Sequence, residues 1–413
     1  MSEPGITVYG AYWCPDCRVS KQFLGEQGIR YNWVNIEEDK EAEQFITELN
    51  DGKRVIPTIT FEDGSFMVFP SNTQLAEKLG LVTKAERTFY DLIVLGAGPA
   101  GLMTALYAER EAIETLVIER AAIGGQAATT EKLDNVPGFP ESVTGEDFSG
   151  RLRQQAEKFG AEILQAQEVS SLRSDGNYHH VTTQDGSEYS ANSLVIASGS
   201  RYRRLGVPGE DAYLGAGVHF CATCDGPFYK GKEVAVVGGG NSAAEESLLL
   251  TRFAEKVTVL VREDNFQASP IIQDKVLSTP KIEVKWNTEV KEFIGAESHL
   301  NKLRLTNNQT GEESEFPVDG VFIFIGTDPN TGFLADTPIA LNKWGYVVTG
   351  HDLVHAASIP EAFKGREPEQ LETSVPGVFA AGDVRSGSTT QVVSAAGEGA
   401  AVALMVRDYL KRV

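Results

Sequence analysis

Two glycine-rich segments, each between an apolar strand and a helix, constrain the fold of this chain more than any other feature. The first, Gly96-Ala97-Gly98-Pro99-Ala100-Gly101, follows the apolar run Asp91–Leu95 and opens a helical pattern that ends near Arg110. A further apolar run, Thr115–Ile118, ends in Glu119. Glycines at this spacing allow a tight turn and let the backbone approach a pyrophosphate closely. The helix N-terminus stabilises the negative charge of the pyrophosphate, and the acid accepts a hydrogen bond from a ribose hydroxyl. The segment predicts a dinucleotide-binding βαβ unit.

The second glycine-rich segment repeats this pattern later in the chain. The apolar run Glu233–Val237 leads into Gly238-Gly239-Gly240-Asn241-Ser242-Ala243, and a strand at Val257–Val261 follows the next helix. A strand at Val378–Val384, carrying Gly382-Asp383, returns to the first unit. The second unit is therefore predicted to be inserted into the first. The predicted fold class is α/β, with two nested Rossmann-type dinucleotide-binding domains.

The cysteines point to redox chemistry. All four lie in two Cys-x-x-Cys pairs, Cys14/Cys17 and Cys221/Cys224. Such pairs close small reversible disulfides, and a chain without further cysteines fits a reducing cytoplasm. A shared zinc site is disfavoured because zinc pairs usually lie about 15 to 20 residues apart. We expect no metal, and two dithiols beside two nucleotide loops predict a relay of electrons.

The first eighty residues have the element order of a thioredoxin-type fold. Strands are predicted at 6–10, 31–36, 55–59 and 65–69, and helices from Cys14 to about residue 27, at 40–49 and at 73–79. Pro15 suits a first helical turn, so Cys14 is predicted at a helix N-terminus, where the N–H groups and the dipole favour a thiolate. Cys14 is the predicted nucleophile and Cys17 the resolving thiol. Pro57 heads a strand, where a cis bond would face the dithiol.

Charge and hydropathy exclude two classes of partner. The 413-residue chain has a net charge of −21, which repels the phosphates of nucleic acids. It has no run of about 18 apolar residues and no basic-then-apolar N-terminus, so neither a membrane span nor a secretion signal is predicted.

Residues 1–80 resemble the glutaredoxins, and within them the mycoredoxin-like members, on the strength of Cys14, Cys17 and the Ile56-Pro57 step. Glutaredoxins usually carry a Gly-Gly pair that holds glutathione, but here the stretch 68–72 reads Val-Phe-Pro-Ser-Asn. This departure argues against glutathione as the partner. Residues 81–88 are predicted to be a linker spanning under roughly 30 Å.

Residues 89–413 resemble the low-molecular-weight thioredoxin reductases. The resemblance rests on both glycine-rich segments, on Cys221-Ala222-Thr223-Cys224-Asp225-Gly226 and on Ala381-Gly382-Asp383-Val384. It implies a homodimeric flavoprotein whose FAD domain (89–205 and 329–413) is interrupted by a nicotinamide domain (206–328) that carries the redox disulfide.

The resemblance also implies which residues contact the cofactors. The implied FAD contacts are Gly96, Gly98, Pro99, Ala100, Gly101, Glu119, Gly125, Gln126, Asn135, Gly199, Gly382, Asp383, Gln391 and Val392. The implied contacts to NADH or NADPH are Gly238, Gly240, Asn241, Ser242, Ala243, Arg262, Glu263 and Gly326.

The implied reaction passes electrons from the nicotinamide through FAD to the second dithiol. Cys224 would face the flavin, Cys221 would attack the next disulfide, and Asp225 would be the general acid. The next acceptor would be the Cys14/Cys17 disulfide, within the chain or across a dimer, and then a protein or low-molecular-weight disulfide. Because dithiol and nicotinamide must reach the same flavin, the inserted domain would rotate on hinges at 198–206 and 326–330.

Four stretches depart from the family or invite another interpretation. NADPH-specific members carry several arginines after the second strand, whereas here Arg262 is followed by Glu263, and a carboxylate favours a 2′-hydroxyl. NADH is therefore favoured and NADPH is the alternative. Residues 351–370 form a longer segment than is usual, expected to be a solvent-exposed insertion. His219 is expected to be a satisfied structural histidine, and His179 with His180 to lie on a strand surface.

Two other functions are open. The chain could be the flavoprotein arm of an alkyl hydroperoxide system that feeds a peroxiredoxin through the N-terminal dithiol. It could also be a redox sensor that turns over slowly, with a donor other than a nicotinamide. Peroxide-dependent NADH loss with added peroxiredoxin would identify the first, and slow turnover with every disulfide acceptor the second.

Overall fold

The structure is a computed structural model that describes residues 5–11, 13–128, 130, 133, 135–141, 143–296, 299–355, 363 and 366–413. The chain divides into two compact units. Unit 1 comprises residues 1–128, 149–199 and 331–413, and unit 2 comprises residues 129–148 and 200–330. Among the described helices, none is long and apolar enough to cross a membrane.

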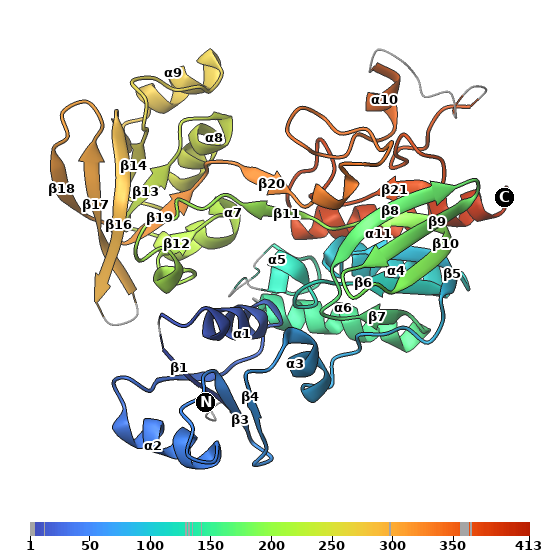
Figure 1. Ribbon diagram of the computed structural model, residues 1–413. Helices are drawn as coiled ribbons and strands as arrows, with labels where there is room; N and C mark the ends of the chain where they lie inside the picture. Colours follow the sequence, from blue (N-terminus) through green and yellow to red (C-terminus); the bar gives the residue numbers. More distant parts are fainter. Residues whose placement is uncertain are drawn as a thin grey trace. The chain divides into compact units, whose positions relative to one another are not determined.

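The N-terminal module of unit 1 is a sheet of order β2-β1-β3-β4 with helices on both faces (Figure 1). Buried Phe23, Leu24 and Leu75 of α1 and α3 pack on one face of the sheet, and Ile46 of α2 packs on the other. The elements are β1 (Ile6–Gly10), α1 (Pro15–Glu26), β2 (Asn32–Asn35), α2 (Lys40–Leu49), β3 (Thr58–Phe61), β4 (Phe66–Val68) and α3 (Asn72–Lys78). This is the order expected of a thioredoxin-type fold.

Local caps explain why these helices begin where they do. The Asp39 side chain accepts from the N–H groups at the start of α2, and Ser71 forms a capping box with Gln74 at the start of α3. The third strand begins at Thr58, three residues later than expected from the sequence, because Pro57 has no N–H to donate to a ladder. The Ile56–Pro57 peptide bond is cis, as expected.

The linker at 81–88 lies along the following sheet. Leu81 packs against the core of the N-terminal module, and the next residue, Val82, accepts a hydrogen bond from the Gln165 N–H at 2.7 Å. The Glu86 N–H donates to Glu162 Oε1 at 2.7 Å. Ala166, from beyond the linker, also packs against the N-terminal core. The module is therefore joined to the rest of unit 1 by a docked segment and not by a free tether.

The remainder of unit 1 is built on a sheet of order β7-β6-β5-β10-β9-β8, with β21 paired to β10. The strands β5, β6, β7, β10 and β21 run parallel, and β8 and β9 form an antiparallel extension. The elements are β5 (Phe89–Leu95), α4 (Pro99–Arg110), β6 (Thr115–Ile118), α5 (Gly125–Ala128), α6 (Gly145–Phe159), β7 (Glu162–Leu164), β8 (Val169–Asp175), β9 (Tyr178–Thr183), β10 (Glu188–Ile196), η3 (Gly332–Leu334), α10 (His351–His355), β21 (Val378–Ala380) and α11 (Val392–Leu410).

Helices α4 and α11 pack closely against each other on this sheet (Figure 1). Gly399 of α11 makes the approach possible, because a Cβ there would lie 2.2 Å from the Ala100 carbonyl oxygen. The two residues before helix α11 set where it begins. Thr390 adopts φ 51° and Gln391 is extended, so the helix starts at once with Val392. Strand β21 pairs with β10 and so returns to the same sheet, as the nested arrangement requires.

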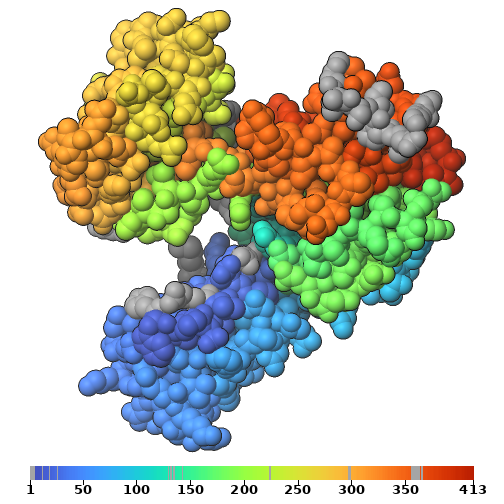
Figure 2. Space-filling model, turned by 45° about the horizontal axis from the view of Figure 1, so that its top comes forward, coloured from blue at the N-terminus to red at the C-terminus, as the bar shows by residue number. Residues whose placement is uncertain are grey.

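Unit 2 contains the second nucleotide sheet, of order β12-β19-β13-β14-β15, all parallel, and an antiparallel sheet of order β16-β17-β18. Side chains of about residues 240–320, yellow to light orange in Figure 2, form a continuous surface over these sheets. The elements are β11 (Ser200–Tyr202), η1 (Asp211–Tyr213), β12 (Val218–His219), α7 (Ala222–Asp225), η2 (Gly226–Tyr229), β13 (Glu233–Val237), α8 (Asn241–Leu250), β14 (Lys256–Leu260), α9 (Pro270–Ser278), β15 (Ile282–Lys285), β16 (Thr288–Ala296), β17 (His299–Asn307), β18 (Glu313–Pro317), β19 (Gly320–Ile323) and β20 (Thr327–Pro329).

Two crossings between the units, at residues 199/200 and 330/331, adjoin one antiparallel ribbon, β11 with β20. Ser200 pairs with Pro329, and Tyr202 pairs with Thr327. An ion pair of 2.8 Å between Arg203 Nε and Asp328 Oδ1 ties the strands together. The segments expected to be hinges therefore form one ribbon and not two independent loops.

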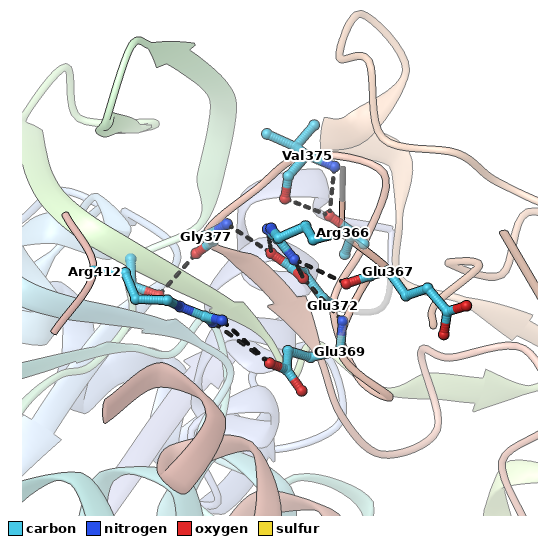
Figure 3. A network of polar contacts seen from close by, with 9 residues as sticks. Arg366, Glu367, Glu369, Glu372, Val375, Gly377 and Arg412 are labelled. Atoms are coloured by element: carbon cyan, nitrogen blue, oxygen red, sulfur yellow. Dashed lines mark hydrogen bonds and ion pairs between the residues drawn. The ribbon is translucent and has the colours of Figure 1, made fainter. Parts of the chain in front are cut away.

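The segment 351–370 differs from the exposed insertion expected from its length. Leu353 and Phe363 are each only 2% exposed. Arg366 donates to both carboxylate oxygens of the fully buried Glu372 at 2.7 Å, as Figure 3 shows. The Glu369 N–H (3.0 Å) and the Gly377 N–H (3.3 Å) also donate to this carboxylate. Apolar anchors and a buried ion pair hold the described part of this segment, whereas residues 356–362, 364 and 365 lie outside the described residues.

Candidate functional site

The first dithiol is a disulfide between Cys14 and Cys17, with the Cα atoms 5.3 Å apart. Cys14 is the N-cap residue of α1, and its Sγ accepts from the Cys17 N–H at 3.1 Å. A sulfur at this place faces the unpaired N–H groups and the positive end of the helix dipole, which stabilise a thiolate. The expected position of Cys14 at a helix N-terminus is confirmed.

Close packing surrounds this disulfide on its inner side. Both cysteines are at least 97% buried, and Trp33 and Ile56 pack against them. A Cβ on Gly10 would lie 2.6 Å from Cys17 Sγ, so only glycine fits there. The neighbouring Trp13 is 57% exposed. The buried sulfurs are thus held beside one exposed aromatic side chain at the start of the helix.

The first glycine-rich loop forms a tight strand-to-helix turn in unit 1. Gly96 adopts φ 110°, and a Cβ on Gly101 would lie 1.8 Å from the Gly96 carbonyl oxygen. Gly98 caps α4 in an extended conformation, and its Cβ position is open. Pro99 occupies the first helical position, so the free N–H groups at this end belong to Ala100 and Gly101. The loop has the tight packing behind and the open approach in front that a pyrophosphate requires.

Glu119 ends β6 beside this loop. Its carboxylate is 9% exposed and accepts from the Ala97 N–H at 2.6 Å and the Ala121 N–H at 2.7 Å. Burial raises the pKa of the Glu119 carboxyl, and the two N–H donors oppose the rise. An acceptor held at this point is suited to a ribose hydroxyl.

Two other predicted FAD contacts, Gly125 and Gly382, pack against the same turn. Gly125, at the start of α5, approaches Gly98, since its Cβ would lie 3.4 Å from the Gly98 Cα. Gly382 follows β21, and its Cβ would lie 3.0 Å from that of Ala100. Gln126 follows Gly125 in α5, while Gln391 caps α11 and Val392 is its first residue. Gly199 is the last residue of the second segment of unit 1, and Asn135 belongs to the part of the chain grouped with unit 2.

Asp383 follows β21 and lies close to Glu398 and Ser388. Burial raises the pKa of the Asp383 carboxyl, the nearby Glu398 adds to the rise, and a hydrogen bond from Ser388 opposes it. Glu398 in turn accepts from the Gly382 N–H at 2.7 Å and pairs with Arg385 at 2.5 Å. Glu398 and Arg385 were not predicted from the sequence, and they hold the turn that carries Asp383.

The second glycine-rich loop, in unit 2, repeats the turn of the first. Gly238 adopts φ 143°, where a Cβ would lie 2.3 Å from the Phe324 carbonyl oxygen, and Gly240 caps α8. Asn241 Oδ1 accepts from the Ser269 N–H at 2.7 Å. Ser242 is exposed and Ala243 is fully buried. The helix N-terminus is therefore open on its Ser242 side.

After the second strand of this unit, Arg262 Nε pairs with Glu263 Oε1 at 3.1 Å on the surface. The guanidinium charge is thus partly balanced by its own neighbour. Gly326 adopts φ 103°, and its Cβ position lies 3.2 Å from Arg203 Nη1 of the ribbon.

The second dithiol lies at the start of α7, where Cys221 directly precedes the helix and Cys224 belongs to it. Cys221 is disulfide-bonded, and the Asp225 N–H donates to its carbonyl oxygen at 3.1 Å. The side chain of Cys224 lies outside the described part of the chain. His219 is 7% exposed and its Nε2 lies 2.6 Å from Tyr229 Oη, so the expectation of a satisfied histidine is confirmed.

Phe220, immediately before Cys221, contacts the ribbon. Its ring stacks on that of Tyr202 with centroids 5.0 Å apart, and Arg204 Cζ lies 5.2 Å from the ring. Neither Tyr202 nor Arg204 was predicted as a site residue. The only available signal was their place in an expected hinge, because the stacking joins residues that are distant in the sequence.

Similarity to known proteins agrees with this arrangement. A family model described as pyridine nucleotide-disulphide oxidoreductase matches residues 90–399, and one described as glutaredoxin matches residues 6–67. The chain belongs to the pyridine nucleotide-disulphide oxidoreductase family. It is an FAD-dependent disulfide oxidoreductase of the thioredoxin reductase type, with a glutaredoxin module at its N-terminus.

Named relatives of this oxidoreductase support the assignment. The chain is 41% identical over 329 residues to thioredoxin reductase of Bacillus subtilis (strain 168), covering 80% of this chain and 97% of the relative. Thioredoxin reductase of Treponema pallidum (strain Nichols) is 40% identical over 323 residues, covering 78% and 98%. Among solved structures, thioredoxin reductase from Streptococcus pyogenes MGAS5005 has a TM-score of 0.71 at 36% identity, covering 79% of this chain and 99% of that one.

The residues of this oxidoreductase fit the flavin that its family implies. The Gly96–Gly101 turn, the open Gly98 and the acceptor Glu119 meet in unit 1, together with Gly125 and Gly382. Cys14 and Cys17 belong to unit 1, and Cys221 belongs to unit 2. Among the described residues no cluster of histidine, cysteine or carboxylate side chains is arranged to hold a metal ion.

The structure corrects the position predicted for the His179 side chain. It was expected on a strand surface, but the side chain is fully buried, and burial lowers its pKa to about 4. Its Nδ1 lies 2.8 Å from Ser174 Oγ, across the β8–β9 hairpin. His180, the next residue, points the other way and pairs with Ser190 Oγ at 2.8 Å.

Proposed function

We propose that this enzyme passes electrons from NADH, in preference to NADPH, through FAD and a Cys221–Cys224 disulfide to the Cys14–Cys17 disulfide of its own glutaredoxin module. From there they go to protein disulfides, or to low-molecular-weight disulfides other than glutathione, in the cytoplasm. When bound, FAD supplies a two-electron acceptor for the nicotinamide hydride and a donor for a disulfide.

The observation that carries this proposal is the position of the first disulfide. Cys14 caps a helix, in a module docked through its linker to the same unit that holds the FAD cradle. A thiolate stabilised there is a good nucleophile toward a disulfide acceptor and a good leaving group when the module is itself reduced.

The dithiol in α7 is proposed to open when two electrons arrive. One sulfur takes a proton from Asp225, and the resulting dithiol then reduces the Cys14–Cys17 disulfide by thiol–disulfide exchange, in which each S–S bond formed replaces one broken. The inserted unit rotates about the β11–β20 ribbon so that the dithiol and the nicotinamide reach the flavin in turn.

The proposed preference for NADH rests on Arg262 and Glu263. A carboxylate paired with the only arginine in the segment that follows β14 accepts from a ribose 2′-hydroxyl and repels a 2′-phosphate. Anaerobic titration of the purified flavoprotein with NADH and with NADPH tests this, and bleaching of the flavin at lower NADPH concentration would contradict it.

The proposed acceptor differs from glutathione because of Phe69 and Pro70. Phe69 stands where glutaredoxins carry a glycine pair, is 56% exposed and donates its N–H to the Pro57 carbonyl at 2.8 Å. A bulky side chain in that place excludes a small peptide thiol and offers apolar area to a protein acceptor.

The test of the route is Cys14→Ser, with Cys17→Ser as its matched control. We expect Cys14→Ser to leave nicotinamide-dependent flavin reduction intact and to abolish protein-disulfide turnover. Cys17→Ser keeps the nucleophile and should accumulate a mixed disulfide with the acceptor, detectable by non-reducing electrophoresis. Undiminished turnover by Cys14→Ser would show that the module takes no part.

A further inference from the structure

A buried polar chain of three residues, Asp225, His219 and Tyr229, lies directly beside the second dithiol. His219 Nδ1 is 3.4 Å from Asp225 Oδ2, and His219 Nε2 is 2.6 Å from Tyr229 Oη. The side chains of His219 and Asp225 are only 7% and 16% exposed, and Tyr229 is 7% exposed. Buried polar groups in such a chain constrain each other strongly because water does not compete for them.

The imidazole is fixed on its faces as well as at its nitrogens. Its ring stacks on Phe322 of β19 with centroids 5.2 Å apart and meets the Tyr229 ring edge-on at 5.3 Å. His219 itself belongs to β12, which pairs with β19 in the parallel sheet. The ring therefore cannot turn away from Asp225 without unstacking from both neighbours.

The partners determine which nitrogen carries the proton in the neutral ring. If Tyr229 donates its hydroxyl hydrogen to Nε2, then Nδ1 carries the N–H, and this N–H is directed toward the Asp225 carboxylate. On its other side, the Tyr229 ring contacts Lys232, whose Nζ lies 5.5 Å from the ring centroid.

We propose that His219 is a positioning residue that orients Asp225 and stabilises its carboxylate after Asp225 has released a proton. The inference deepens the proposed function, on which it rests, by explaining how a buried acid can act repeatedly. When the disulfide accepts two electrons and opens, one thiolate takes the Asp225 proton and leaves a buried carboxylate. The Nδ1–H of His219 compensates that charge until a thiol returns a proton during the next exchange.

Two substitutions separate this role from a packing role. His219→Leu removes both nitrogens but keeps an apolar side chain against Phe322. His219→Asn places an amide N–H near the position of Nδ1. His180→Leu, at a histidine that pairs with Ser190 in unit 1, is a control for the general effect of losing a histidine.

The experiment measures disulfide turnover by the holoprotein at neutral pH, with a nitrophenyl disulfide as acceptor and the nicotinamide that the wild type prefers. Without the Nδ1–H, the Asp225 carboxylate is neither oriented nor compensated after its proton has left. We therefore expect the rate of His219→Leu to fall about tenfold, part of the general-acid contribution. His219→Asn should recover most of the rate, which a residue that only packs against Phe322 would not explain.

Asp225→Asn distinguishes failure of the inference from failure of the proposed function. If Asp225→Asn turns over as fast as the wild type, Asp225 is not the acid and both fall. If Asp225→Asn is impaired but His219→Leu turns over as fast as the wild type and His180→Leu, or His219→Asn is as slow as His219→Leu, only the role of His219 is overturned. Flavin absorbance and far-ultraviolet circular dichroism of each variant check that the fold is kept.

Discussion

Removal of Arg366 should destabilise unit 1, because it leaves the buried Glu372 carboxylate without its charged partner. The Glu372 carboxylate is fully buried and receives two of its hydrogen bonds from Arg366 and two from backbone N–H groups (Figure 3). Breaking a buried ion pair by removing one partner costs about 3 to 5 kcal/mol. Because two N–H donors remain and the Arg366 side chain is 32% exposed, we expect Arg366→Met to cost about 3 kcal/mol.

This loss should be visible in the thermal melting of the holoprotein. A loss of about 3 kcal/mol corresponds to a melting midpoint lower by roughly 6 to 12 °C at pH 7.

Arg412→Met is the matched control. Arg412 pairs with Glu369 at 3.5 Å in the same network, but both side chains are more than 40% exposed. Such a pair contributes about 0 to 1 kcal/mol, so the melting midpoint should change little. An Arg366→Met loss no larger than that of Arg412→Met would refute the reasoning from burial.

Further predictions concern the flavin loop and a buried histidine. Gly101→Ala places a Cβ 1.8 Å from the Gly96 carbonyl oxygen and should abolish both folding of the loop and flavin content. Gly98→Ala, where the Cβ position is open, should keep the melting temperature of the flavin-free protein and weaken FAD binding. Equal behaviour of the two variants would be inconsistent with the steric argument. His179 has a pKa lowered to about 4 by burial, so the unfolded state binds more protons and stability falls as the pH drops from about 6.5 toward 4, by up to about 3 kcal/mol. His179→Leu should flatten that part of the denaturant midpoint-against-pH curve, and an unchanged slope would show that another group causes it.

The features that sequence could predict are those whose signal is local. Cys14 followed by Pro15 marks a helix start, and α1 begins there. The glycines of both nucleotide loops were identified from their spacing after an apolar strand, and in the structure Gly96 and Gly238 adopt positive φ. This spacing is a pattern of a few consecutive residues, so it can be recognised without the rest of the fold.

The features that sequence did not predict depend on which distant segments meet. Nothing near His179 indicates that its hairpin turns that side chain inward while His180 points away. The stacking of Tyr202 on Phe220 joins a hinge strand to the residue before the dithiol. Arg366 and Glu372 have the composition of a solvated loop, and only the packed structure makes them a buried pair. In each case tertiary packing overrides a local preference.

The docked linker has a consequence for the kinetics of the proposed route. Leu81 packs into the N-terminal core and Val82 accepts a hydrogen bond from Gln165, and the Cys14–Cys17 disulfide and the first glycine-rich loop belong to the same compact unit. In the proposed route, the dithiol of unit 2 reacts with the flavin and with the Cys14–Cys17 disulfide in turn, because it can contact only one of them at a time. Loading and unloading of electrons must alternate, so initial rates measured against nicotinamide at several acceptor concentrations should give the parallel double-reciprocal lines of a ping-pong mechanism.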